Sequence, residues 1–290
     1  MNGTVSMVVA GLLASSAVRA DRVPHVPGHV AAVSIPAPSL HEGGRNVLVY
    51  LPPSYDRPES ARRRYPVLEL LHGEPGGNLD WPLRVHIDAL LDSLIARRRI
   101  PEVLVLMPDA SGPGPGRRSL YLNSFDGRLR MEDFIVGDVL DWADRHLRTR
   151  TTAVARAIVG VSDGANAALN IAFKHPDRFG ACAGHSGEYI WKHTPEMPAV
   201  LGPEPGASRL LAENSPLLYA KQVAPRLRGL LIYFDAGLLD VAFLDDRSLD
   251  RELVALVVPH EYREYWGWHD WSAWRARLAI SLPFVTRRMW

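Results

Sequence analysis

Ten residues near the middle of this chain, 157–166, constrain its fold more than any other stretch. A short apolar run ends abruptly at Ser162, and a helical pattern begins at once and continues to Lys174. Gly160 and Gly164 flank the serine, each two positions away. Where a strand turns sharply into a helix, a side chain at either glycine would collide with the crossing backbone. The stretch therefore predicts a tight strand–helix turn that exposes the serine hydroxyl at the positive end of the helix.

Apolar strand-like runs alternate with helical patterns along the rest of the chain. We expect strands at 30–35, 45–52, 65–73, 103–107, 179–183, 230–234 and 260–265. Helical periods occupy 84–96, 132–147, 163–174, 247–256 and 271–284. Several of the strands are apolar throughout, which is typical of parallel strands covered on both faces. The pattern predicts an α/β fold with a mainly parallel central sheet and helices on both faces.

Two long segments lack such periodicity. Residues 117–130 have the pattern of a surface loop. Residues 187–218 are rich in proline, and irregular segments of this length in compact domains are usually lids or binding loops.

Composition excludes several classes of protein. The chain has 290 residues, 47% of them hydrophobic, enough for one large core. Its net charge of +1 gives no electrostatic case for binding nucleic acid. The arginine runs at 62–64 and 97–99 are interpreted as solvated loop or helix ends. The single cysteine, Cys182, excludes an intrachain disulfide and a cysteine-based metal cluster and is expected in the core.

The amino-terminal residues divide into two parts. Residues 1–20 contain an apolar run of signal-peptide length, with small residues at positions suited to cleavage before Asp21. We expect export to the periplasm or medium; the alternatives are the trimmed end of a longer membrane anchor or a misplaced start, the latter compatible with a cytoplasmic protein. Residues 21–44 are interpreted as an extension with a first strand, and residues 45–290 as the main domain. The sequence gives no firm evidence for membrane insertion and does not indicate an oligomeric state.

Polar residues follow the predicted strands at the edge where reactive groups of α/β proteins gather. A serine needs a base, and His269 follows the last predicted strand. An acid must hold the imidazole, and Asp240 follows the preceding strand, with Asp235 as its main competitor. The order serine, acid, histidine is the one that α/β-hydrolases use, so we expect that fold and a Ser162–His269–Asp240 triad.

An attacking serine also requires backbone donors for the oxyanion that forms. Asp163, at the start of the helix, offers one N–H, and Glu74, in the loop after the 65–73 strand, offers another. His72 is interpreted as a residue that orders this loop rather than as the base.

Several stretches of the chain together resemble one family. They are Asn46–Tyr55, Tyr65–Gly73, Val105–Asp109, Gly160–Gly164, His175–Gly180 and Glu264–Trp271. In this order they resemble the esterase D-type α/β-hydrolases, a group that includes feruloyl and acetyl-xylan esterases and the antigen 85 mycolyltransferases. The resemblance implies that Ser162, Asp240 and His269 form the triad. The chain departs from the family pattern at Glu74, Asp163, Ala165 and Trp268.

We therefore expect a serine carboxylic-ester hydrolase that acts through an acyl-enzyme on a small-molecule, carbohydrate or lipid ester. No cofactor or metal is expected. His72, Trp191 and Trp268 are candidate substrate contacts. The alternatives are an acyltransferase to a sugar or lipid alcohol and an exported binding protein of weak activity.

Overall fold

The computed structural model describes residues 27–112, 118–192 and 198–290. The predicted export signal before Asp21 lies outside the described residues.

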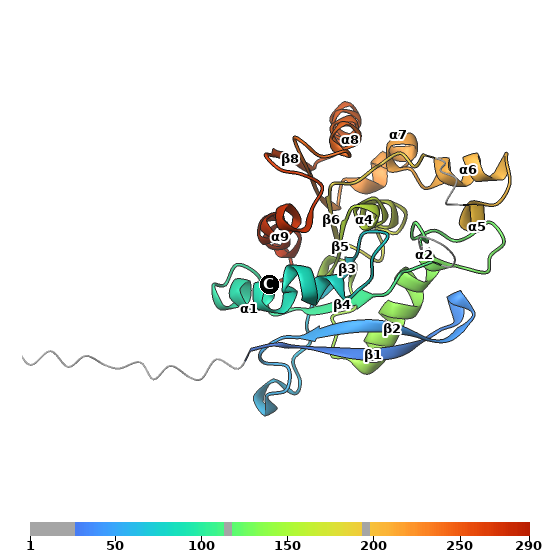
Figure 1. Ribbon diagram of the computed structural model, residues 1–290. Helices are drawn as coiled ribbons and strands as arrows, with labels where there is room; N and C mark the ends of the chain where they lie inside the picture. Colours follow the sequence, from blue (N-terminus) through green and yellow to red (C-terminus); the bar gives the residue numbers. More distant parts are fainter. Residues whose placement is uncertain (1–26, 113–117, 193–197) are drawn as a thin grey trace, which may run out of the picture.

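An eight-stranded sheet forms the centre of the molecule, in the order β1-β2-β4-β3-β5-β6-β7-β8 (Figure 1). The strands are β1 (His29–Ala37), β2 (Glu42–Leu51), β3 (Val67–Leu71), β4 (Leu104–Pro108), β5 (Arg156–Val161), β6 (Ala181–His185), β7 (Leu231–Gly237) and β8 (Glu261–Tyr265). The pairs β1–β2 and β2–β4 are antiparallel, and all other neighbours are parallel. The predicted α/β fold with a mainly parallel sheet is confirmed. The boundary expected at residue 45 falls inside β2, so the amino-terminal hairpin belongs to the same sheet.

Helices cover both faces of the sheet (Figure 1). They are α1 (Ile87–Ala96), α2 (Met131–Asp133), α3 (Leu140–His146), α4 (Asp163–Lys174), α5 (Pro198–Leu201), α6 (Gly206–Glu213), α7 (Pro216–Leu227), α8 (Phe243–Ala255) and α9 (Trp271–Thr286). One apolar cluster joins the sheet to α1 and α9, and the other joins it to α3, α4, α7 and α8. Cys182 lies in the second cluster, as predicted. Among the described residues, no helix combines the length and apolarity that crossing a membrane requires.

The proline-rich segment 187–218 is not the irregular loop that its lack of periodicity suggests. It contains α5, α6 and the start of α7. Two of its prolines begin helices: Pro198 is the first residue of α5 and Pro216 the first of α7, a position where proline loses no hydrogen bond. Val200, Leu201 and Leu211 pack in a small separate apolar cluster, which gives these helices their own core.

The prediction of a surface loop at 117–130 is also partly wrong. Residues 118–130, its described part, form no regular helix or strand, but Leu120, Tyr121 and Leu122 are buried rather than on the surface. The helix expected at 132–147 is present, although residues 134–139 adopt π-helical hydrogen bonding between α2 and α3. The two arginine runs are exposed, as predicted.

One charged side chain lies inside the sheet. Glu69, in the middle of β3, is fully buried, and neither of its carboxyl oxygens has a hydrogen-bond partner in the described residues. Burial raises the pKa of Glu69 to about 8, although Arg156 and Arg178 act in the opposite direction. At neutral pH this carboxyl is therefore mostly protonated.

Candidate active site

The turn at Ser162 is as sharp as the glycine spacing predicts. Ser162 has φ 56° and ψ −126°, a strained conformation for a residue with a side chain. A Cβ at Gly160 would lie 1.9 Å from the Gly164 carbonyl oxygen, and a Cβ at Gly164 would lie 2.3 Å from that of Leu71. The Ser162 N–H donates to the His185 carbonyl at 3.0 Å and ties the turn to β6. Only glycine fits at the two flanking positions.

Three side chains from distant parts of the chain form a continuous line at this edge of the sheet. The Ser162 hydroxyl is 2.9 Å from His269 Nε2, and His269 Nδ1 is 2.8 Å from Asp240 Oδ1. Ser162 follows β5, Asp240 follows β7 and His269 follows β8. Parallel strands end on one edge, so these residues meet although they are up to 107 positions apart.

Asp240 and its competitor Asp235 occupy different environments. Asp235 accepts from Tyr233 at 2.9 Å and pairs with His185 at 2.9 Å and with Arg277 at 3.3 Å. This network lies within the core, and Asp235 is fully buried. Only Asp240, of the two, contacts the His269 ring.

Asp240 is held as a carboxylate. Burial raises the pKa of Asp240, but hydrogen bonds from His269, Ser186 and the Ala242 N–H outweigh it, so this pKa lies below its usual value. The ionised carboxylate can keep the proton of His269 on Nδ1 and leave Nε2 free to accept the serine proton.

Two backbone N–H groups adjoin the serine. The loop after β3 passes so close that a Cβ at Gly73 would lie 3.0 Å from the Ser162 Cβ. Neither the Glu74 N–H nor the Asp163 N–H donates to any group within the described parts of the chain. Both are therefore available as donors to a negatively charged oxygen beside Ser162.

The carboxyl groups of these two residues have partners of their own. Glu74 Oε1 accepts from the Ser119 N–H at 2.8 Å and Glu74 Oε2 from the Leu120 N–H at 2.9 Å. Asp163 Oδ2 accepts from Arg118 Nε at 3.0 Å and from Nη2 at 2.7 Å. Burial, with the charge of Asp163, raises the pKa of Glu74 to about 8. Burial also raises the pKa of Asp163 to about 6, although Arg118 opposes this. The pair carries less negative charge at neutral pH than two free carboxylates would.

Comparison with known proteins identifies the family. A family model described as "Putative esterase" matches residues 39–285. The chain belongs to this esterase family. A ferulic acid esterase structure superposes with a TM-score of 0.81 at 26% identity, over 91% of this chain and 99% of that one. The family resemblance and the α/β-hydrolase fold predicted from the sequence are both confirmed.

Two further proteins are similar to this chain, one in structure and one in sequence. An S-formylglutathione hydrolase from Agrobacterium tumefaciens superposes with a TM-score of 0.75 at 17% identity, over 91% of the esterase and 97% of that chain. An endo-1,4-beta-xylanase/feruloyl esterase from Xylanibacter ruminicola is 27% identical over 136 residues, which are 46% of the esterase. The aligned part is only 18% of that relative's length. The family model and these similarities place the chain in a family of carboxylic ester hydrolases.

A cavity of about 220 Å³ opens beside Ser162 and His269. Its other lining residues come from the loop after β3, from Asp80 and Arg84, and from Trp271 and Trp274 on α9. The small volume leaves room near the serine for a compact group.

The structure does not bring the three candidate substrate contacts to this cavity. His72 is fully buried; its Nδ1 lies 2.9 Å from the Gly73 carbonyl, and its Nε2 accepts from the Ala110 N–H at 3.1 Å. These two contacts join the loop after β3 to the residues that follow β4. Trp191 is only 4% exposed and packs in the small cluster with α5 and α6. Trp268 is 61% exposed but does not line the cavity.

Two residues near Ser162 and His269 were not predicted from the sequence. The Trp274 and His269 rings are in a T-shaped contact, with their centroids 4.9 Å apart. Trp274 Nε1 donates to the Ser186 hydroxyl. Its spacing of three from Trp271 on one helix face was an available signal. Arg118 gave no local signal, because its partner Asp163 is 45 residues away.

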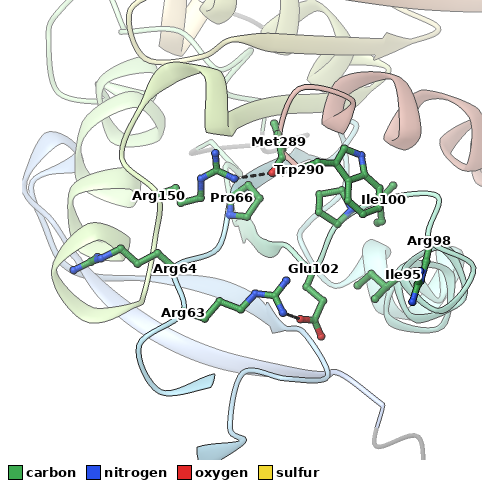
Figure 2. Close-up of a pocket in the computed structure, with 11 residues that line it drawn as sticks. Arg63, Arg64, Pro66, Ile95, Arg98, Ile100, Glu102, Arg150, Met289 and Trp290 are labelled. Atoms are coloured by element: carbon green, nitrogen blue, oxygen red, sulfur yellow. Dashed lines mark hydrogen bonds and ion pairs between the residues drawn. The ribbon is translucent and has the colours of Figure 1, made fainter. Parts of the chain in front are cut away.

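A larger cavity, of about 660 Å³, lies elsewhere (Figure 2). Arg63, Arg64, Arg98 and Arg150 line it, with Arg63 paired to Glu102 at 2.5 Å. Ser162, Asp240 and His269 do not line it.

Proposed function

We propose that Ser162, His269 and Asp240 are the catalytic triad of this esterase. The observation that carries the proposal is the line of contacts from the Ser162 hydroxyl through both nitrogens of the His269 ring to the carboxylate of Asp240, at 2.9 and 2.8 Å. Such a line activates a hydroxyl that is otherwise a poor nucleophile.

The reaction follows from the geometry. The Ser162 oxygen attacks the ester carbonyl while His269 Nε2 takes its proton. The N–H groups of Glu74 and Asp163 stabilise the oxyanion of the tetrahedral intermediate. Its collapse breaks the ester bond, and His269 returns the proton to the leaving alcohol. A water molecule then attacks the acyl-enzyme by the same steps and releases the acid.

A structural relative described above supports a proposal for the substrate class. The 26% identical structure is a ferulic acid esterase, and its superposition covers nearly all of both chains. We propose esters of aromatic acids as the first substrates to test, beside short aliphatic esters that fit the 220 Å³ cavity.

The test measures hydrolysis of p-nitrophenyl acetate, p-nitrophenyl butyrate and ethyl ferulate, together with labelling by a fluorophosphonate. Ser162→Ala is expected to abolish both turnover and labelling. Ser248→Ala is the matched control, since Ser248 is a half-buried serine on α8 whose hydroxyl donates to the Leu244 carbonyl of the same helix. Equal turnover by wild type and Ser162→Ala would refute the proposal. Acyl transfer to an added polyol, seen by product analysis, would identify an acyltransferase instead.

A further inference from the structure

One short segment holds both residues that offer N–H groups to the oxyanion. Arg118 donates to Asp163 Oδ2 through Nη2 at 2.7 Å and through Nε at 3.0 Å. The next two residues, Ser119 and Leu120, donate their N–H groups to the carboxyl of Glu74. The Ser119 hydroxyl donates to the same carboxyl at 3.0 Å. Two loops that are distant in sequence are thereby joined to one support.

The same segment also holds the backbone beside Glu74. The Tyr121 hydroxyl donates to the His72 carbonyl at 2.6 Å, two residues before Glu74. Tyr121 is fully buried, so this contact is fixed by packing on all sides. Residues 118–121 therefore hold the loop after β3 by three hydrogen bonds to the Glu74 side chain and one to the His72 main chain.

The segment has an unfavourable backbone conformation that these contacts maintain. Leu120 has φ 52° and Tyr121 has φ 57°, both in the left-handed region that residues with a Cβ seldom adopt. Two such residues in succession persist only where the surroundings fix them. Glu74 accepts from the Leu120 N–H, and the Ser119 hydroxyl accepts from the Tyr121 N–H at 3.0 Å. The strained turn and the carboxyl of Glu74 thus stabilise each other.

We propose that residues 118–121 position both N–H groups of the oxyanion site by holding the side chains of Glu74 and Asp163. Arg118 and the carboxyl of Glu74 are then positioning residues, while the catalytic contacts are made by the backbone. This inference rests on the proposed function. It explains why acidic residues are tolerated at both donor positions: their carboxyl groups are bound by the segment instead of facing the developing negative charge.

The experiment compares Arg118→Met and Glu74→Gln with wild type. Gln at position 74 keeps the contacts to Ser119 but replaces one acceptor with an NH₂ group facing the Leu120 N–H. We expect kcat to fall by about 10- to 100-fold in each variant with KM changed less than about twofold, because misplaced donors weaken the transition state rather than substrate binding. Affinity for phenylboronic acid, which forms a negatively charged tetrahedral adduct with the serine oxygen, should fall by a similar factor.

Three further variants test whether the geometry of the Arg118 contact, its charge or the stability of the protein causes the effect. Arg63→Met removes another arginine–carboxylate pair, the one with Glu102 in the distant cavity of Figure 2, and should leave kcat and boronate affinity unchanged. Arg118→Lys keeps the charge but not the two-nitrogen contact, so only partial recovery is expected. Ser119→Ala, which removes one contact to Glu74, supplies a milder variant if Arg118→Met does not fold.

Two sets of results would overturn the inference. Wild-type kcat and boronate affinity in both Arg118→Met and Glu74→Gln would show that the segment does not position the donors. Full recovery in Arg118→Lys would show that only the charge of Arg118 matters. Either result, obtained while Ser162→Ala is inactive, leaves the proposed triad intact. An inactive wild-type protein that a fluorophosphonate does not label would instead refute the proposed function itself.

Discussion

Glu69 provides the most quantitative test of the structure. Its carboxyl is fully buried in β3 and has no hydrogen-bond partner among the described residues. The unfolded chain exposes it to water, where its pKa returns to about 4.5, whereas burial raises the pKa to about 8 in the folded protein. The folded state therefore binds a proton that the unfolded state releases. This contribution to stability is complete below about pH 4.5 and is lost as pH rises through 8.

The perturbation is Glu69→Gln, a neutral side chain of the same shape that does not titrate. Each pH unit over which the folded state alone retains the proton changes the free energy of unfolding by about 1.4 kcal/mol. Between about pH 6 and pH 9 the wild type should lose about 2–3 kcal/mol relative to Glu69→Gln. Other titrating groups, including Glu74 and Asp163, are present in both proteins and cancel in the difference.

The assay is urea unfolding of both proteins at several pH values, with the free energy of unfolding compared at each. Glu59→Gln is the control, since Glu59 is exposed. The difference in free energy of unfolding between Glu59→Gln and wild type should not change between pH 6 and pH 9. A wild-type-minus-variant difference that stays constant within about 0.5 kcal/mol from pH 6 to pH 9 would refute the reasoning. It would mean that Glu69 finds water or a charged partner in the folded protein.

Three further predictions concern the site and the chain's amino terminus. Asp240→Asn should fold normally but lose about 10³- to 10⁴-fold in kcat, because an amide no longer holds the proton on His269 Nδ1; an unchanged kcat would exclude Asp240 from the triad. Gly160→Ala should prevent soluble folding, seen by circular dichroism, since the new Cβ would lie 1.9 Å from the Gly164 oxygen. A folded, active Gly160→Ala protein would contradict the described turn. Export should leave Asp21 as the first residue by mass spectrometry, and an uncleaved chain would argue against a signal peptide.

The sequence by itself determined the features that depend on neighbouring residues. The glycines around Ser162 specify the turn through local steric contacts, and the apolar runs specify buried strands. Together with the order of serine, acid and histidine, these patterns predicted the α/β-hydrolase fold and the edge of the sheet where the candidate site lies, while the family was predicted from the resemblance of six stretches of the chain. The turn and each strand are encoded within about ten residues, so predicting them needs no knowledge of distant contacts.

Only the tertiary structure decided which distant groups meet. Asp235 and Asp240 lie five positions apart, at and just after the end of one strand. Only the packed structure shows that Asp235 contacts His185 and that Asp240 contacts His269. The 118–121 segment has the composition of a loop, yet it is buried against residues 45 or more positions away. Those contacts depend on how strands and helices pack, so the local sequence does not predict them.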